Sequence, residues 1–221
     1  MRVLLLMIFI FGFPLSPMAD EPTYKGGKLA LERFINQHII YPSFSKSNCL
    51  EGVIYVSFQL DSLGNVIKTN VEKGFGIDLD DEAQRVIRLT SGKWIVTPEN
   101  VKNISMVLPV NFSLENPLCN NITEADKKRA IEYYKIQEGL QNTVFNYYKN
   151  KESNQANNKN ETDILKLKEE LGFNEDFITS KLEEAHKKIA QKDFKSACQT
   201  LQIIKNIGSN AANKLLSQYC N

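Results

Sequence analysis

The sequence lacks an excess of either positive or negative charge. Its 221 residues carry 27 Lys and Arg against 26 Asp and Glu, which leaves a formal net charge of +1. A strong positive field is typical of proteins that bind nucleic acid or an anionic membrane surface. The near balance argues against both classes, and we expect no nucleic acid among the partners.

Metal-binding side chains are scarce and unfavourably spaced. The chain has only two histidines, and none of its four cysteines forms a C-x-x-C pair. A zinc site, which needs several Cys or His ligands close together, is therefore not expected. The acidic run Asp78–Glu82 lacks the ligand spacing of an EF-hand, and we interpret it as a helix start, where the helix dipole favours carboxylates. We expect neither a metal nor a cofactor.

Catalytic signatures are also missing. The sequence contains no G-x-S-x-G nucleophile elbow and no Walker phosphate loop. His38 lies on the apolar face of a predicted helix, and His186 lies beside two lysines on a predicted solvated face. Because no nucleophile, base and orienting group occur together, we expect that the protein is not an enzyme.

No apolar run reaches the roughly 20 residues that a membrane-spanning helix needs. At the start of the chain, Arg2 supplies a positive charge, the run from Val3 to Phe13 is uncharged, and Ala19 offers a small residue for cleavage. This pattern predicts a secretory signal peptide at 1–19, which would place the chain in the periplasm. The alternative is an uncleaved N-terminus that anchors the chain in the inner membrane.

Export would place the four cysteines in an oxidising compartment, where disulfides form. Cys198 and Cys220 flank a predicted helical turn at Gly208, about 14 and 17 Å from it at 1.5 Å per residue. This offset is small enough for a bridge, which we predict and which would contribute roughly 2–4 kcal/mol. Cys49 and Cys119 flank the first domain and are a second candidate pair. The alternative for all four is a buried, unpaired thiol.

Residues 20–115 combine helical and strand periodicities. One helix is predicted where Leu31, Phe34 and His38 recur at three- and four-residue steps, and a second follows the acidic run. Alternation of apolar and polar side chains predicts three strands. These strands are 52–61, 66–72 and 104–114. The sequence therefore predicts an α+β domain with two helices and a three-stranded antiparallel sheet, followed by an all-α domain.

Particular residues of this first domain carry further expectations. Ile67, Thr69 and Val71 alternate along the second strand and are predicted to share a face. Trp94, the only tryptophan, is expected to anchor the core. Pro109 lies within the third strand. Because proline has no amide hydrogen for the ladder, this strand is expected at an edge or a bulge.

Helical periodicity dominates after residue 115. Residues 116–148 are predicted to contain one long helix, which begins at a capping box formed by Thr123 and Asp126. Residues 149–162 are polar and rich in asparagine. Such a segment buries no core, and we expect a flexible linker.

Residues 163–221 are predicted to fold as further helices. Asn174, Asp193 and Ser209 are expected to cap three of them. The final helical hairpin is similar to tetratricopeptide or Sel1-like repeats, in which small and aromatic residues interlock. The alternative is an unclassified helical domain.

A series of residues in 22–114 follows one order and spacing. These are Pro22, Gly26, Gly27, Leu31, Phe34, Tyr41-Pro42, Glu51-Gly52, Asp61, Gly64, Asp81-Glu82-Ala83, Trp94 and Leu108-Pro109-Val110-Asn111-Phe112. With them the segment resembles the TonB C-terminal domain family, in the form common in periplasmic proteins of Bacteroidetes-type bacteria. Energy-transducing members have an N-terminal membrane helix and a long Pro-rich arm, and neither pattern is found here. The family's proline after the tryptophan is displaced to Pro98.

The resemblance implies a protein-interaction function. In the family, a short peptide of an outer-membrane TonB-dependent transporter is added as a strand to the open sheet edge. By analogy, Tyr41 and Pro42 shape the neighbourhood of a docking strand formed by Ser105, Val107, Leu108, Pro109, Val110, Asn111 and Phe112. The implied role is in transmembrane transport. The alternative is a non-transducing envelope scaffold that uses its helical domain as an interaction module.

Overall fold

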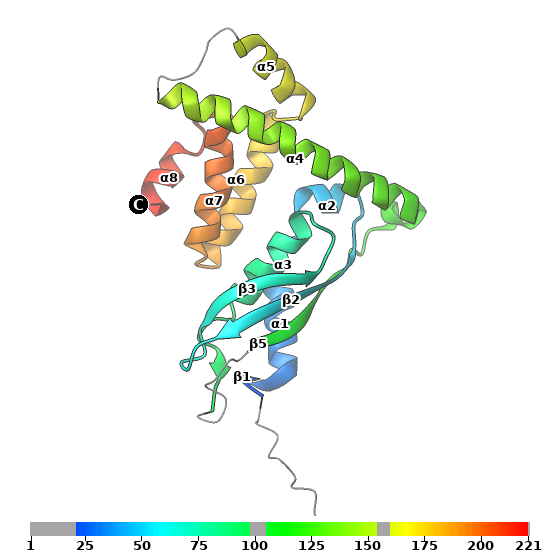
Figure 1. Cartoon of the computed structure of the whole chain (residues 1–221), viewed down its shortest axis with the longest axis vertical. Coiled ribbons are helices and arrows are strands. Elements are labelled where there is room, and N and C mark those ends of the chain that lie inside the picture. Colours follow the sequence, from blue (N-terminus) through cyan, green and yellow to red (C-terminus); the bar gives the residue numbers. More distant parts are fainter. Residues whose placement is uncertain (1–20, 98–104, 154–159, 221) are drawn as a thin grey trace, which may run out of the picture.

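The computed structural model describes residues 21–97, 105–153 and 160–220. It contains an α/β unit and a helical unit, which lie at opposite ends of the molecule (Figure 1). The elements, in chain order, are β1 (Thr23–Tyr24), α1 (Gly27–His38), α2 (Ser43–Ser47), β2 (Gly52–Leu60), β3 (Val66–Lys73), α3 (Asp78–Arg88), β4 (Trp94–Ile95), β5 (Ser105–Phe112), the 3₁₀ helix η2 (Pro117–Asn121), α4 (Glu124–Glu152), α5 (Glu161–Glu170), α6 (Glu175–Ala190), α7 (Phe194–Asn206) and α8 (Asn213–Tyr219).

The main sheet has three antiparallel strands in the order β3-β2-β5. The central strand, β2, pairs with β5 without a break from Gly52 opposite Phe112 to Gln59 opposite Ser105. β5 is therefore an edge strand among the described residues, as its Pro109 predicts.

The core of the α/β unit lies between the sheet and the helices α1 and α3. Burying each large apolar side chain contributes about 1.5–3 kcal/mol, and Ile54, Phe58 and Val86 are at most 1% exposed. Trp94 is 3% exposed, and its indole Nε1 donates to Thr90 Oγ1 at 2.9 Å. The predicted tryptophan anchor is therefore confirmed.

The α/β unit is more complex than two helices and three strands. The short helix α2 begins directly after Pro42, and the strands β1 and β4 form a separate ribbon that pairs Tyr24 with Trp94. Helix α2 has only five residues, and β1 and β4 have two residues each. Such short segments contain too few residues to show a periodicity, which is why the predicted layout missed them.

The predicted face of β3 is wrong at Ile67. Gln59 pairs with Lys68, but the next residue, Leu60, pairs with Val66, so Ile67 is the extra residue of a β-bulge. Val66 packs against the core, whereas Ile67 is 63% exposed. A bulge shifts the alternation of inward and outward side chains by one residue. The prediction from sequence assumes an unbroken alternation and therefore places Ile67 on the wrong face.

The acidic run begins α3, as predicted. Its side chains bind the loop that precedes the helix and the neighbouring helix α2. Asp80 accepts the amides of Phe75 at 3.0 Å and Gly76 at 2.7 Å, and Asp78 accepts hydrogen bonds from Ser45. The carboxylates therefore stabilise the entry to α3.

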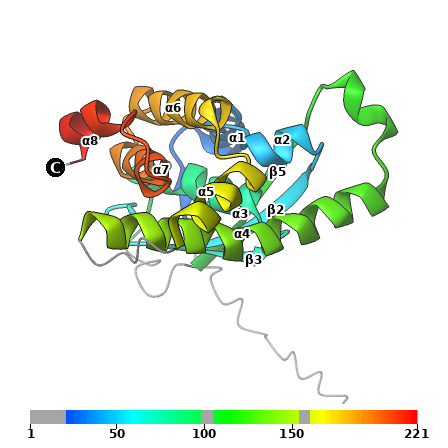
Figure 2. The same cartoon turned by 90° about the horizontal axis from the view of Figure 1, so that it is seen from above.

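One long helix, α4, packs against both cores. It begins at the predicted capping box, in which Thr123 and Asp126 exchange side-chain and amide hydrogen bonds. Its first half places Ile131 and Tyr134 against the α/β core, and its second half buries Val144 in the helical core. Seen from above, α4 runs along one side of both units (Figure 2).

The helical unit is built around the α6–α7 hairpin. Asn174 and Asp193 cap these helices by accepting backbone amides, as predicted. The predicted cap at Ser209 is wrong, because its hydroxyl accepts the amide of Ala211 in the preceding turn and α8 begins only at Asn213. A tetratricopeptide or Sel1-like repeat stays a prediction.

The predicted linker at 149–162 is helical at both ends. Residues 149–152 complete α4, and 161–162 begin α5. Residues 154–159 lie outside the described ranges, as do the predicted signal peptide at 1–19 and Pro98. Within the described ranges, none of the helices has the length and hydropathy to cross a membrane.

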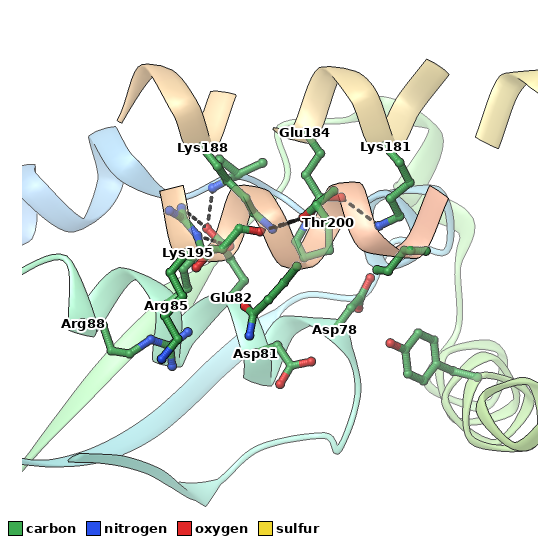
Figure 3. A pocket seen from close by; sticks show the side chains of 16 residues that line it. Asp78, Asp81, Glu82, Arg85, Arg88, Lys181, Glu184, Lys188, Lys195 and Thr200 are labelled. Atoms are coloured by element: carbon green, nitrogen blue, oxygen red, sulfur yellow. Dashed lines mark hydrogen bonds and ion pairs between the residues drawn. The ribbon is translucent and has the colours of Figure 1, made fainter. Parts of the chain in front are cut away.

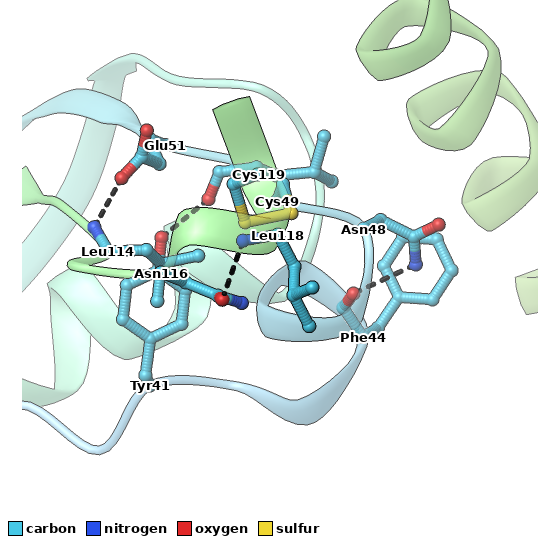
Figure 4. The surroundings of a disulfide bond; sticks show 10 residues. Tyr41, Phe44, Asn48, Cys49, Glu51, Leu114, Asn116, Leu118 and Cys119 are labelled. Atoms are coloured by element: carbon cyan, nitrogen blue, oxygen red, sulfur yellow. Dashed lines mark hydrogen bonds between the residues drawn. A yellow bond between two sulfur atoms is a disulfide. The ribbon is translucent and has the colours of Figure 1, made fainter. Parts of the chain in front are cut away.

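Two disulfides connect elements that are separate in sequence. The predicted Cys198–Cys220 bridge is present and joins α7 to the end of α8. The second candidate pair, Cys49–Cys119, joins the loop after α2 to η2 (Figure 4). Beside it, Glu51 accepts the amide of Leu114. The chain that leaves β5 is thereby attached to the loop that enters β2.

The two units are joined by a buried polar cluster around Arg85. Its guanidinium donates to Glu82 at 2.7 Å, to Asp193 at 3.1 Å and to the carbonyl of His38 at 2.6 Å. Gln191 accepts from Arg85 and donates to the same carbonyl. Burial alone would lower the pKa of Arg85, but Glu82 and Asp193 together outweigh this and raise it. The residue is therefore a charged connector between α3 and the α6–α7 turn.

A second, partly buried ionic cluster supports α6 and α7. Glu184 accepts hydrogen bonds from Lys181 at 2.8 Å, from Lys188 at 2.6 Å and from Thr200 at 3.3 Å. Burial alone would raise the pKa of Glu184, but the two lysines outweigh it and hold the pKa at about 2. The folded protein therefore stabilises the ionised form of the Glu184 carboxyl group over the protonated form.

This cluster predicts an acid-sensitive contribution to stability. Because the folded pKa is below the unfolded one, the contribution is complete above about pH 5 and is lost as the pH falls toward about 2. Replacing Glu184 by Gln should lower the free energy of unfolding by about 3 kcal/mol at pH 7 and by much less at pH 3. Urea unfolding at both pH values measures this. The exposed neighbour Glu183→Gln is the control, and equal losses at the two pH values would contradict the assignment.

Candidate strand-docking edge

β5 offers one free side for another strand. Its inner side pairs with β2 over its whole length, and no described strand pairs with its outer side. In an antiparallel ladder, every second residue turns its N–H and C=O away from the partner strand. The outer side of β5 therefore presents a row of unpaired backbone groups, the usual template for strand addition.

The position of Pro109 indicates which residues face outward. Pro109 lies opposite Tyr55, and the β2–β5 register continues past it without a shift. Because a proline nitrogen cannot donate, an intact ladder requires this nitrogen on the outer side. By the two-residue period, the amides of Val107 and Asn111 also face outward. An incoming strand would therefore find donors on either side of Pro109.

The predicted docking residues divide between two faces of the sheet. Val110 and Phe112 are buried in the core, and Leu108 packs against it. By the same two-residue period, the backbone groups of these three residues face β2, so they support the edge from inside and offer no group to an added strand. The side chains that are exposed beside the edge belong to Ser105, Val107, Pro109 and Asn111.

An exposed apolar patch adjoins the edge on the outer face of the sheet. Val53 and Tyr55 of β2 are each 39% exposed and lie opposite Asn111 and Pro109, while Val107 is 53% exposed. Side chains of an added strand would reach this patch. The β2 alternation places Val53 and Tyr55 on this face, but the sequence does not assign them to the site.

Tyr41 and Pro42 have different surroundings. The Tyr41 hydroxyl donates to the Leu50 carbonyl at 2.5 Å, and its ring packs edge-on against Phe112 with centroids 5.7 Å apart. Burial, reinforced by nearby Glu51, raises the pKa of Tyr41. Tyr41 therefore supports the end of β5 from inside. Pro42 instead precedes α2 and lines a cleft between the two units.

Neither histidine belongs to a catalytic arrangement within the described part of the chain. His38 Nδ1 donates to the Phe34 carbonyl at 2.8 Å, and its ring stacks on Phe34. His186 is exposed on α6. Both positions agree with the structural interpretation of these residues.

Comparison with known proteins adds one match. Residues 37–114 match the family model of the Gram-negative bacterial TonB protein C-terminal, over less than half of the 221-residue chain. No curated protein and no solved structure matches the chain. The matched segment begins at the end of α1 and includes Tyr41, Pro42 and all of β5. The match supports a TonB C-terminal-type domain that ends in the open edge strand.

Proposed function

We propose that this chain is a periplasmic, TonB-like interaction protein that binds an extended peptide of an outer-membrane TonB-dependent transporter by strand addition to β5. The observation that carries the proposal is the outer side of β5, with which none of the described strands pairs. The family match over the same segment supports a role in transport-related protein interaction. A cleaved signal peptide at 1–19 would deliver the chain to the periplasm.

The expected affinity is modest. Each backbone hydrogen bond contributes about 1 kcal/mol net, and Pro109 removes one donor from the row. Selectivity would come from side chains of the added peptide that contact Val53, Tyr55 and Val107. An exposed hydrophobic patch beside an open edge suits a peptide that alternates apolar and polar residues.

The alternative is a non-transducing envelope scaffold, in which the helical unit binds a further partner. The Arg85 cluster supports this alternative, because it fixes the helical unit against the α/β unit. The processing of the N-terminus tests whether the chain transduces energy. A retained, membrane-held N-terminus favours transduction, and a cleaved soluble chain favours a non-transducing role. For a cleaved chain, capture of the transporter through β5 then distinguishes strand docking from the scaffold.

Blocking the outward amides of β5 should weaken capture of the transporter. Replacing Val107 and Asn111 together by proline removes two outward donors without removing a β2–β5 hydrogen bond, and should weaken binding about 30-fold. Affinity capture from envelope extracts, with the transporter identified by mass spectrometry, measures this. Val107→Ala with Asn111→Ala is the matched control, because it changes the same side chains and keeps the amides.

Trp94 fluorescence should be unchanged in the proline variant, since the tryptophan reports the core of the α/β unit. Capture of a transporter at the wild-type level by the correctly folded proline variant would refute strand docking at β5.

A further inference from the structure

A polar cleft of about 590 Å³ separates the α/β unit from the α6–α7 hairpin (Figure 3). α3 forms one wall, and α6 and α7 form the opposite wall. The cleft lies at the interface between two units, which is a common place for ligand sites. It is separate from the β5 edge, because α3 lies between them on the inner face of the sheet.

Charges along α3 change sign from one end of the cleft to the other. Asp78 and Asp81 line its beginning, and Arg85 and Arg88 line its end. Asp81 and Arg88 are seven residues apart on one helix, which corresponds to about 10 Å along the axis. The wall therefore presents an acidic and a basic region about three extended residues apart.

Most of the charged side chains that line the cleft form ion pairs within the protein. Arg85 is bonded to Glu82 and Asp193, and Glu184 is bonded to both Lys181 and Lys188. The first cluster has a net charge of −1 and the second a net charge of +1, so each charge is paired and the two clusters offset each other. They form the frame of the cleft.

Other polar groups that line the cleft have at most one weak bond to the described part of the protein. Asp81, Lys195 and the hydroxyl of Tyr134 make no hydrogen bond or ion pair with any residue that the structure describes. Arg88 has a single long hydrogen bond, 3.4 Å to Thr69. Burial, followed by the nearby carboxylates, raises the pKa of Tyr134, so its hydroxyl remains a donor. The cleft therefore offers two cations, one acceptor and one donor to a ligand.

An aromatic hollow of about 380 Å³ continues the cleft beyond the start of α3. The two cavities share Asp78, Tyr134 and Lys181, and the hollow is also lined by Phe44 and Phe177. From Asp78 to Arg88, α3 extends about 15 Å, which is the length of four or five extended residues. One elongated site thus has an aromatic end and a cationic end.

We propose that this cleft binds a short extended peptide whose carboxylate pairs with Arg88 and Lys195 and whose large apolar side chain fills the hollow beside Phe44 and Phe177. Along the peptide, Asp81 accepts a backbone N–H and Tyr134 donates to a carbonyl. Two unpaired cations favour a carboxylate, through charge-assisted hydrogen bonds. The carboxylate is either a free C-terminus or an acidic side chain. The site does not rest on strand docking at β5.

Labelled five-residue peptides, measured by fluorescence anisotropy on the full mature chain, test this proposal. Phe-Ala-Gly-Ala-Ala with a free C-terminus should bind at least about tenfold more tightly than its C-terminal amide. Phe-Ala-Gly-Ala-Glu-amide distinguishes the two sources of carboxylate. Binding of this peptide assigns the site to an acidic side chain, and loss of binding assigns it to a chain terminus. Equal binding of the Ala-ended acid and both amides overturns the proposal.

Variants locate the peptide. Arg88→Gln with Lys195→Gln should weaken binding of the free acid at least about tenfold, whereas Arg33→Gln with Lys214→Gln, on exposed surfaces of α1 and α8, should not. A loss in the Val107→Pro, Asn111→Pro variant, which blocks β5, would place the peptide on the strand edge instead. Either that result or full binding by the Arg88, Lys195 variant overturns the assignment to the cleft.

Discussion

Replacing Arg85 by alanine should lower the free energy of unfolding by about 3–5 kcal/mol. The side chain of Arg85 is only 3% exposed, and its removal leaves Glu82, 5% exposed, and Asp193, 10% exposed, without their cation. Uncompensated buried charge is costly, because the carboxylates have lost hydration and regain none. The loss also separates α3 from the α6–α7 turn, so the helical unit should become more mobile relative to the α/β unit.

Urea unfolding followed by two signals measures this effect. Trp94 fluorescence reports the α/β core, and far-UV circular dichroism is dominated by the long helices of the other unit. Arg129→Ala is the matched control, because Arg129 also pairs with an acid three residues earlier, Asp126, but is 71% exposed. An exposed pair contributes at most about 1 kcal/mol. A loss of similar size in both variants would contradict the connector role of Arg85.

Removing the Cys49–Cys119 disulfide should be about as costly. The bond links residues that are 70 positions apart and encloses β2, β3, α3, β4 and β5. In the chain-entropy description, opening a loop of this length lowers the free energy of unfolding by about 4 kcal/mol. The cost should fall on the α/β unit, since the bond anchors the segment that follows β5.

The serine pair Cys49→Ser, Cys119→Ser tests this expectation in urea unfolding followed at Trp94. The second pair, Cys198→Ser, Cys220→Ser, is the comparison. It opens a loop of 22 positions, for which the same relation gives about 3 kcal/mol, and it lies in the helical unit. A change below about 1 kcal/mol at Trp94 for the first pair would show that the open chain is already restrained in the unfolded state.

The sheet and its free edge were predictable because their signals are local. Alternation along a strand assigns one face to the core, and Val110 and Phe112 are buried as that pattern requires. Pro109 adds the edge position, since proline excludes a central strand. The bulge at Ile67 was not predictable, because it depends on how β3 pairs with β2 and not on either strand alone.

The contacts between the two units are not indicated by any local pattern in the sequence. Arg85 reaches His38 across 47 positions and Asp193 across 108. In the sequence, Arg85 is one of 27 basic residues and has no feature that marks it as buried. The cleft depends on the same docking, because it brings α3 against two helices that come about a hundred residues later. Hydrophobic periodicity predicts the type of each helix or strand and its buried face. It does not predict which other element the polar face of a helix will contact.

The long helix α4 has a consequence for dividing this protein into fragments. A fragment cut near residue 115, where the sequence changes character, would lose Ile131 and Tyr134 from the surface of its core and Cys119 from its disulfide. A fragment that keeps only the later helices would lose Val144, which is fully buried among them. The smallest autonomous α/β piece must therefore extend well into α4, and each half of that helix is indispensable to a different core.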